Sequence, residues 1–344
     1  MYRLASRLIP LLCLVMIAAP ALCGAAETAN FRDVVPPNSG TGEAQGDPLE
    51  TFPTSWAANP IGLAFDFYDP TTVWFFHEAD PGPGIYRVDV AAPHGSTPFV
   101  YSKLGGPNTD GGSIRPSDGY IYAADYNGDL VTIDDNIYLY DRSGSTVAFW
   151  ETDTGLAGTP CSGGEVNVIL DVAVDHQNPG IVYATSAVGQ IYALDLSDTS
   201  GGSASPSACA VLASFPPPAG ITITTGIEYD PCNDGYWIAD FSSANLVLVA
   251  NDGTFATVIE SFPGGAVGGF NTGVTPQVDG ETPLPLWTVD FSAAVVTRVD
   301  SATPGCTLAA TILAIPTLGR FGLGAIALAL AGCAWFMLRH RRTA

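Results

Sequence analysis

The 344-residue sequence predicts an all-β protein, a β-propeller of about five to six four-stranded blades, from three observations. From Pro60 onward, short apolar, β-branched and aromatic runs alternate with turns rich in Gly, Pro, Asn and Asp. The same part of the sequence contains no amphipathic helical stretch. Similar segments recur at intervals of roughly 50 residues, a period typical of propeller blades. A β-sandwich is the alternative fold, and a β-helix is disfavoured by the long repeat.

The N-terminal segment, residues 1–26, has the pattern of a signal peptide. Arg3 and Arg7 form a basic start, residues 8–22 form an apolar stretch, and small residues follow it. Cleavage is therefore expected near Glu27, in an exported protein. The alternative, lipid attachment at Cys23, is disfavoured because Leu22 is larger than the residue usual at that position.

Residues 27–59 are polar and rich in Gly, Pro and Glu. We interpret them as a lead-in that contributes one closing strand to the propeller. Residues 60–314 are the expected propeller domain, in which the run CTLAATIL, residues 306–313, is expected to finish the last blade.

The repeats are clearest in two segments that match almost residue for residue. WIADFSSANLVLV begins at Trp237, and WTVDFSAAVVTRV begins at Trp287. Weaker copies begin at Trp74, Tyr122 and Tyr183, so five repeats are visible. Several copies are preceded by an alternating strand that ends in an Asp-containing turn, as in GLAFDFYDP, LDVAVDHQNP and TGIEYDP. A sixth blade would have to lie between Tyr122 and Tyr183 or use the N-terminal segment.

This repeat motif, an aromatic residue followed by Ala or Val, Asp and a further strand, resembles NHL-type propeller repeats. The resemblance covers roughly residues 60–313 and implies that each blade buries both faces against its neighbours. Such packing agrees with the high apolar and aromatic content of a sequence with few charges.

The C-terminal segment, residues 315–344, combines a short motif, an apolar run and a basic end. The motif is Ile315-Pro316-Thr317-Leu318, and the apolar run extends over residues 321–338. Eighteen residues at helical rise span about 27 Å, so the run predicts one transmembrane helix. The positive-inside rule keeps the basic end in the cytoplasm, with the arginines Arg339, Arg341 and Arg342.

This combination resembles the IPTL-type C-terminal sorting signal of Gram-negative bacteria. The family most often has Trp-Gly after the motif, where this sequence has Phe321-Gly322. The resemblance implies export, processing by an exosortase-like membrane protease, and an association with exopolysaccharide production. The body would lie on the periplasmic side of the inner membrane and then at the cell surface or outside the cell. The alternative is an ordinary single-pass anchor.

The exported part is strongly acidic. Residues 27–314 hold six Lys and Arg against all 34 Asp and Glu, a net charge of −28. Such a body repels nucleic acid and attracts cations or basic partners. Solubility of a secreted domain is the simpler explanation of the charge.

Four cysteines lie in the body, an even number without a CxxC pair: Cys161, Cys209, Cys232 and Cys306. Two disulfides are favoured over a metal site, because zinc sites usually show close ligand pairs. Three pairings are possible, with a slight preference for Cys161–Cys209 from their place in one repeat.

Aligning the repeats places His77, Asp125, Ser186, Asp240 and Asp290 at one equivalent position. If they face one channel, Asp125, Asp240 and Asp290 form a candidate Ca²⁺ site. The favoured alternative is that each Asp caps a turn by accepting backbone N–H groups. The segment that begins at Asp125 resembles a calcium loop but lacks its Gly and Glu, and a hairpin turn at Asn127-Gly128 explains it more simply.

No familiar catalytic motif accompanies these residues. GxSxG, HExxH, Walker and Rossmann patterns are absent, and His77, His94 and His176 are expected at the surface. Tyr126, Phe241 and Phe291 are candidates for stacking on sugars, with core packing as the favoured alternative.

We therefore expect a non-enzymatic, membrane-tethered and sorted surface protein with a binding or structural propeller. Its partners would be the exosortase-like protease and a cell-envelope or exopolysaccharide component, and not nucleic acid. The alternative is a Ca²⁺-dependent propeller hydrolase of lactonase or esterase type.

Overall fold

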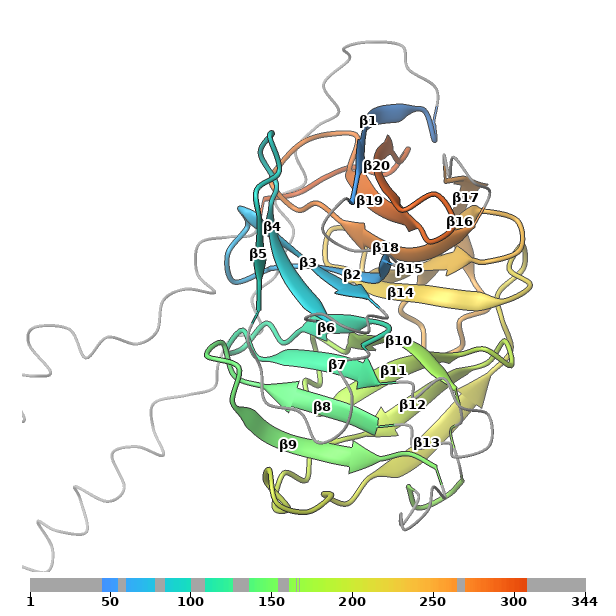
Figure 1. Ribbon diagram of the computed structural model, residues 1–344. Helices are drawn as coiled ribbons and strands as arrows, with labels where there is room; N and C mark the ends of the chain where they lie inside the picture. Colours follow the sequence, from blue (N-terminus) through green and yellow to red (C-terminus); the bar gives the residue numbers. More distant parts are fainter. Residues whose placement is uncertain are drawn as a thin grey trace, which may run out of the picture. The chain divides into compact units, whose positions relative to one another are not determined.

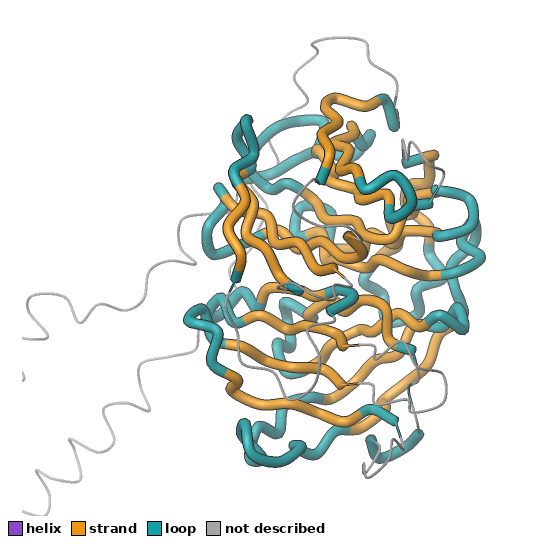
Figure 2. Tube along the Cα trace, viewed as in Figure 1, coloured by secondary structure: helices purple, strands orange, loops and turns teal. Residues whose placement is uncertain are grey.

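The computed structural model describes residues 45–54, 60–77, 84–99, 109–125, 136–153, 161–164, 166, 168–264 and 270–307. In this part of the chain, twenty strands form five four-stranded antiparallel sheets (Figure 1). Figure 2 shows that strands and loops make up the described chain. The predicted signal peptide, sorting motif, transmembrane helix and basic end lie outside the described residues.

Each sheet is one propeller blade, with its strands in the order given from the innermost outward. Blade 1 consists of β2 (Pro60–Phe65), β3 (Thr72–His77), β4 (Ile85–Asp89) and β5 (Ser96–Pro98). Blade 2 consists of β6 (Gly112–Ile114), β7 (Ile121–Asp125), β8 (Asn136–Tyr140) and β9 (Thr146–Glu151). Blade 3 consists of β10 (Ile169–Val174), β11 (Ile181–Ser186), β12 (Ile191–Asp195) and β13 (Ala210–Phe215). Blade 4 consists of β14 (Thr224–Asp230), β15 (Gly235–Asp240), β16 (Asn245–Ala250) and β17 (Val258–Pro263). Blade 5 consists of β18 (Asn271–Pro276), β19 (Pro285–Asp290), β20 (Val295–Asp300) and β1 (Pro48–Pro53).

The innermost strands contact one another in ring order. β2 lies against β6, β6 against β10, β10 against β14, β14 against β18, and β18 against β2 again. The five blades therefore close into a propeller, as predicted. The long interval between Tyr122 and Tyr183 supplies strands of blades 2 and 3 and, among the described residues, no additional blade.

The ring is closed by the N-terminal strand β1, which pairs with β20 from Pro48↔Val299 to Pro53↔Val295. The closing strand expected from the lead-in is thus confirmed. The expectation that residues 306–313 finish the last blade is wrong for the described part, because β1 occupies the outer edge of β20. Thr307 forms only an isolated bridge with Asp279.

The leading aromatic residue of each repeat lies on the second strand of its blade, and the largest are completely buried. Trp74, Trp237 and Trp287 are at most 1% exposed, so the repeat pattern marks the layers that pack between blades. Each indole N–H donates a hydrogen bond to the side chain of the residue at the end of the innermost strand of the same blade, or directly after it. The three acceptors are Asp66 at 2.8 Å, Asp230 at 2.9 Å and Gln277 at 2.6 Å.

The Asp-containing turns of the repeats also have a direct structural cause. Asp66 Oδ1 accepts the backbone N–H groups of Tyr68 and Asp69, each at 3.0 Å. Asp230 Oδ1 accepts those of Cys232 and Asn233. The carboxylate therefore organises the turn and positions the tryptophan at once.

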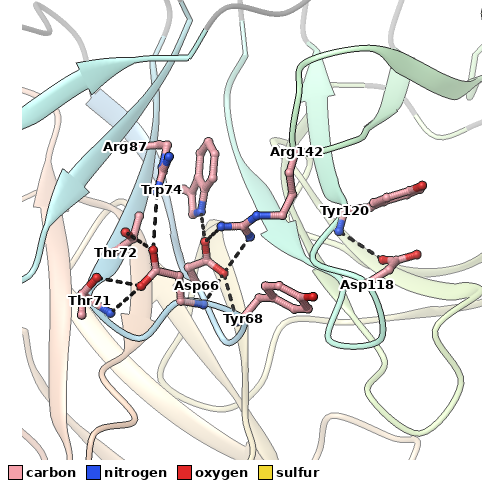
Figure 3. Close-up of polar contacts among 10 residues, drawn as sticks. Asp66, Tyr68, Thr71, Thr72, Trp74, Arg87, Asp118, Tyr120 and Arg142 are labelled. Carbon is pink, nitrogen blue, oxygen red and sulfur yellow. Dashed lines mark hydrogen bonds and ion pairs between the residues drawn. The ribbon is translucent and has the colours of Figure 1, made fainter. Parts of the chain in front are cut away.

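Arg142, in the turn between β8 and β9, connects blade 2 to blade 1 (Figure 3). Its guanidinium donates to both oxygens of Asp66, at 3.1 and 2.8 Å, and lies over the rings of Tyr68 and Trp74. The Asp66 side chain is completely buried and that of Arg142 is 27% exposed. Asp69 lies on the same turn as Asp66 and forms a longer ion pair with Arg87 of β4, at 3.5 Å, in which both side chains are exposed.

Two disulfides join the four body cysteines. Cys161–Cys209 joins the segment before β10 to the start of β13, and Cys232–Cys306 joins the turn after β14 to the segment after β20. The second bond therefore links blade 4 to the end of blade 5. Disulfides of this kind are typical of exported proteins.

Candidate functional site

A cavity of about 360 Å³ lies at one mouth of the central channel. Its lining includes the equivalent residue of every blade, which is the second residue of the innermost strand in four blades and lies two residues before β6 in blade 2: Ile61, Asp110, Leu170, Thr225 and Thr272. The remaining wall comes from turns and connections of blades 3, 4 and 5: Ala187, Ile223, Phe241 and Phe291. We call this cavity the mouth pocket.

Neighbouring innermost strands approach each other closely at the glycines that follow the pocket residues Ile61 and Thr225. A Cβ on Gly62 would lie 2.4 Å from Cα of Gly111, and one on Gly226 would lie 2.7 Å from Cα of Gly273. Only glycine allows backbones to approach this closely. Next to the mouth pocket, the innermost strands of these blades are therefore packed backbone against backbone.

The two threonines of the pocket direct their hydroxyls to the backbone of the next blade. Thr225 Oγ1 lies 2.9 Å from the carbonyl oxygen of Asn271, and Thr272 Oγ1 lies 3.4 Å from that of Pro60. These hydroxyls are thus engaged in joining blades. A ligand would meet a largely apolar wall.

The rim of the pocket exposes aromatic and aliphatic side chains. Phe241 and Phe291 follow directly after β15 and β19 and are half-buried. The Phe241 ring contacts Phe270, with centroids 5.0 Å apart, and Phe270 is 36% exposed. Val188, in the turn after β11, is 68% exposed. Phe241 and Phe291 therefore belong to a pocket wall and not to the core, whereas Tyr126 lies outside the described residues.

A pair of buried carboxyl groups lies along the channel below the pocket. Asp171 follows the pocket residue Leu170, and its two oxygens accept the N–H groups of Val172 and Ile227. Burial raises the pKa of Asp171 well above its usual range, and the nearby Glu228 adds to that shift. The backbone N–H groups that Asp171 accepts act in the opposite direction and lower its pKa.

Glu228 connects blade 4 to blade 2 within the channel. Its Oε1 accepts the hydroxyl of Ser113 at 3.0 Å and the N–H of Tyr229 at 2.9 Å. Its Oε2 is buried and has no hydrogen-bond partner among the described residues. Burial raises the pKa of Glu228 well above its usual range, which favours the neutral acid.

The candidate Ca²⁺ ligands are the last residues of second strands, one strand away from the channel. Asp240 accepts the N–H groups of Thr222, Ile223 and Ser242, and Asp290 accepts those of Ser292 and Ala293. Asp125 ends β7 in blade 2 and is 5% exposed. Among the described residues, no group of three or more His, Cys, Asp and Glu side chains is placed to hold a metal ion. The structure thus shows Asp240 and Asp290 in the turn-capping arrangement.

The expectation of surface histidines is wrong for His77 and His94, which are 3% and 8% exposed. His94 contacts Glu50 of β1 at 2.8 Å and stacks on Phe52 with ring centroids 4.1 Å apart. His94 therefore helps to fasten the closing strand to blade 1.

His176 lies between the rings of Phe67 and Tyr229, and both of its ring nitrogens are buried. This burial lowers the pKa of His176 to about 3. The histidine is therefore neutral at physiological pH.

Sequence reasoning missed most of the mouth pocket, including Ile61, Asp110 and Leu170. The sequence pattern that could have located the pocket is the recurrence of five short segments, IGLAF, GGSI, LDVAV, TGIEY and TGVTP. They align at one position, which is occupied by Gly62, Gly111, Asp171, Gly226 and Gly273. The residue just before that position is the pocket residue in each blade.

Comparison with known proteins identifies no family for this chain. No family model matches the chain, and no curated protein matches it. Among solved structures, it resembles the crystal structure of a nidogen/laminin complex at 16% identity and a TM-score of 0.44, over 71% of this chain and 77% of that one.

Two other similar structures are enzymes. Glutaminyl cyclase from Myxococcus xanthus matches at 11% identity and a TM-score of 0.48, over 74% of this chain and 94% of that one. The PQQ-bound aldose sugar dehydrogenase from Streptomyces coelicolor matches at 16% identity and a TM-score of 0.42, over 74% and 97%. The expectation that the chain is not an enzyme is corrected, because a propeller architecture by itself gives no ground for excluding catalysis.

Among the residues that the structure describes, no helix has the length and apolar character needed to cross a membrane.

Proposed function

We propose that this chain is an exported surface protein whose propeller binds a small ligand in the mouth pocket. The observation that carries the proposal is a pocket to which all five blades contribute and whose wall includes the half-buried rings of Phe241 and Phe291. Its volume of about 360 Å³ lies within the range of small-molecule sites. Ligand sites are typically concave and mostly apolar, as this one is.

Binding would be driven by burial of apolar ligand surface against Phe241, Phe291 and Ile223. Each Å² removed from water contributes about 25 cal/mol, before the cost of association. Because the threonine hydroxyls already have backbone partners, an apolar group entering the pocket leaves no donor of theirs unsatisfied.

The test measures binding of the neutral fluorophore prodan to the purified protein. Phe241→Ala and Phe291→Ala should each weaken binding about tenfold, since each removes one aromatic wall. Ile259→Ala is the matched control, because Ile259 is an apolar side chain, 48% exposed, on the outer strand β17. Equal affinity for all four proteins would contradict the proposal.

The location of the protein is a second part of the proposal. The tail sequence supports membrane tethering, with the body on the periplasmic side, and sorting by an exosortase-like protease toward a cell-envelope or exopolysaccharide component. Replacing Ile315-Pro316-Thr317-Leu318 with alanines should leave an unprocessed membrane form. Intact mass of the native protein checks this, and a chain that still ends beyond Arg342 in the unaltered protein would contradict processing.

A further inference from the structure

One position of the blades contributes three residues to the wall of the mouth pocket. Ala187, Phe241 and Phe291 directly follow the second strands β11, β15 and β19, and all three line the pocket. The N–H of Ala187 donates to the carbonyl oxygen of Val168, directly before β10, at 3.0 Å. The N–H of Phe241 donates in the same way to that of Ile223, directly before β14, at 3.1 Å. Blade 3 therefore has a methyl group at the position where blades 4 and 5 have a phenyl ring.

The ring of Phe241 shows what a ring in blade 3 would cover. It contacts Phe270, the residue directly before β18 in the next blade, with ring centroids 5.0 Å apart. The residue at the corresponding place beside Ala187 is Ile223, and this side chain lines the pocket. Ala187 itself is exposed, whereas Phe241 is half-buried. The pocket therefore includes the place that a ring at position 187 would take.

We propose that the ligand of the mouth pocket is a neutral aromatic compound, one ring of which occupies the place of the phenyl group that blade 3 lacks. This inference rests on the proposed function. The ring lies against Ile223 as Phe241 lies against Phe270, and Ala187 is the residue whose small size admits it. A cavity of about 150 Å³ holds one benzene molecule, so a pocket of about 360 Å³ has room for a second ring or a short chain as well.

The lining favours an aromatic and uncharged ligand over a strongly polar one. Phe241 and Phe291 offer rings for edge-to-face or offset stacking, which adds to the burial of apolar surface. The hydroxyls of Thr225 and Thr272 donate to backbone carbonyl oxygens of neighbouring blades, so their protons are already used. A strongly polar ligand would therefore lose hydrogen bonds to water that these two hydroxyls do not replace.

The first experiment compares two neutral alcohols with the same carbon skeleton, 2-phenylethanol and 2-cyclohexylethanol, by displacement of prodan from the purified protein. Each affinity is corrected for the partition of the alcohol between water and octanol, which removes the difference in hydrophobicity. The unaltered protein should then bind the aromatic alcohol about 3- to 10-fold more tightly, because aromatic pairs contribute beyond the area that they bury. This comparison needs no variant and is independent of any effect of mutation on folding.

Variants then test the place of the ring. Ala187→Phe supplies the phenyl group from the chain itself, so the ligand's ring is excluded and loses the burial that the pocket gives it. Binding of 2-phenylethanol and of prodan should weaken at least about tenfold. Ala256→Phe is the matched control, because it adds the same ring to an exposed turn between β16 and β17. It should leave both affinities unchanged.

The outcomes separate this inference from the proposed function. If Phe241→Ala and Ala187→Phe both leave prodan binding unchanged, the pocket is not a ligand site and both proposals fail. If Phe241→Ala weakens binding but Ala187→Phe does not, or if Ala256→Phe weakens it as much as Ala187→Phe, the role of Ala187 is refuted while the proposed function stands. If the two alcohols bind equally well after the correction, the pocket binds apolar ligands in general and the aromatic class is refuted.

Discussion

Replacement of Arg142 by Met tests whether the ion pair between blades 1 and 2 stabilises the ring. In the native protein, Asp66 accepts five hydrogen bonds, two from Arg142 and three from the N–H groups of Tyr68, Asp69 and Trp74. Methionine retains much of the apolar side-chain volume and removes the charge. The buried carboxylate then loses two of its five donors.

The magnitude follows from what remains around Asp66. Removing one partner of a buried ion pair typically costs about 3–5 kcal/mol. Because three donors stay in place, the lower end applies, and the loss of contacts with two aromatic rings adds about 0.5–1 kcal/mol. We expect Arg142→Met to lower the free energy of unfolding by about 3.5–4 kcal/mol.

The assay is equilibrium unfolding in urea at pH 7 with the disulfides intact. Arg87→Met is the control, since Arg87 also lies over Trp74 but its pair with Asp69 is exposed. It should cost less than about 1 kcal/mol. If both variants lose the same small amount, Arg142 behaves as a surface residue and the reasoning about the buried carboxylate is refuted.

Three further predictions concern the disulfide and two buried groups. Cys232→Ser combined with Cys306→Ser should lower the free energy of unfolding by about 4 kcal/mol, because the bond closes a loop with a separation of 74 residues; a loss below about 1 kcal/mol would contradict this. Below pH 6.5 the free energy of unfolding of the native protein should fall by about 1.4 kcal/mol per pH unit, since the lowered pKa keeps His176 neutral in the folded state while it is protonated in the unfolded state. His176→Phe should abolish this fall. Acid unfolding curves check it, and an unchanged slope in the variant would refute it. Glu228→Gln should change the free energy of unfolding at neutral and alkaline pH, above the ordinary pKa of a glutamate. The raised pKa means that the folded state holds a proton which the unfolded state releases above its ordinary pKa, so native stability falls as pH rises, and the variant should be the more stable protein at pH 8. Equal stabilities of native and variant proteins from pH 5 to pH 9 would contradict that account.

Much of the fold could be predicted because each blade is encoded locally. Alternating apolar residues define the strands, and the Asp-containing turns end them. The repeat alignment at His77, Asp125, Ser186, Asp240 and Asp290 coincides with the last residue of the second strand in every blade. The register of the repeats was therefore readable without any long-range information.

The same alignment did not predict which strand faces the channel. The candidate Ca²⁺ site required Asp240 and Asp290 to face the axis. They instead end second strands and accept backbone N–H groups of nearby turns, which is the alternative that the sequence analysis favoured. The channel is lined by the preceding strand, whose short segments vary from blade to blade. Glu228 and Asp171 appeared in the sequence as ordinary polar positions within two such segments.

The sequence by itself determined the local features: the strands, their turns, the repeat period and an even set of cysteines for disulfides. Only the tertiary structure decided how these features meet. It paired β1 with β20, it placed Ser113 against Glu228, and it assembled one residue from each blade around the mouth pocket. The physical reason is that side-chain alternation and turn chemistry act between neighbours in the chain. The contents of the channel depend on the arrangement of five blades around one axis, which brings together residues more than a hundred positions apart.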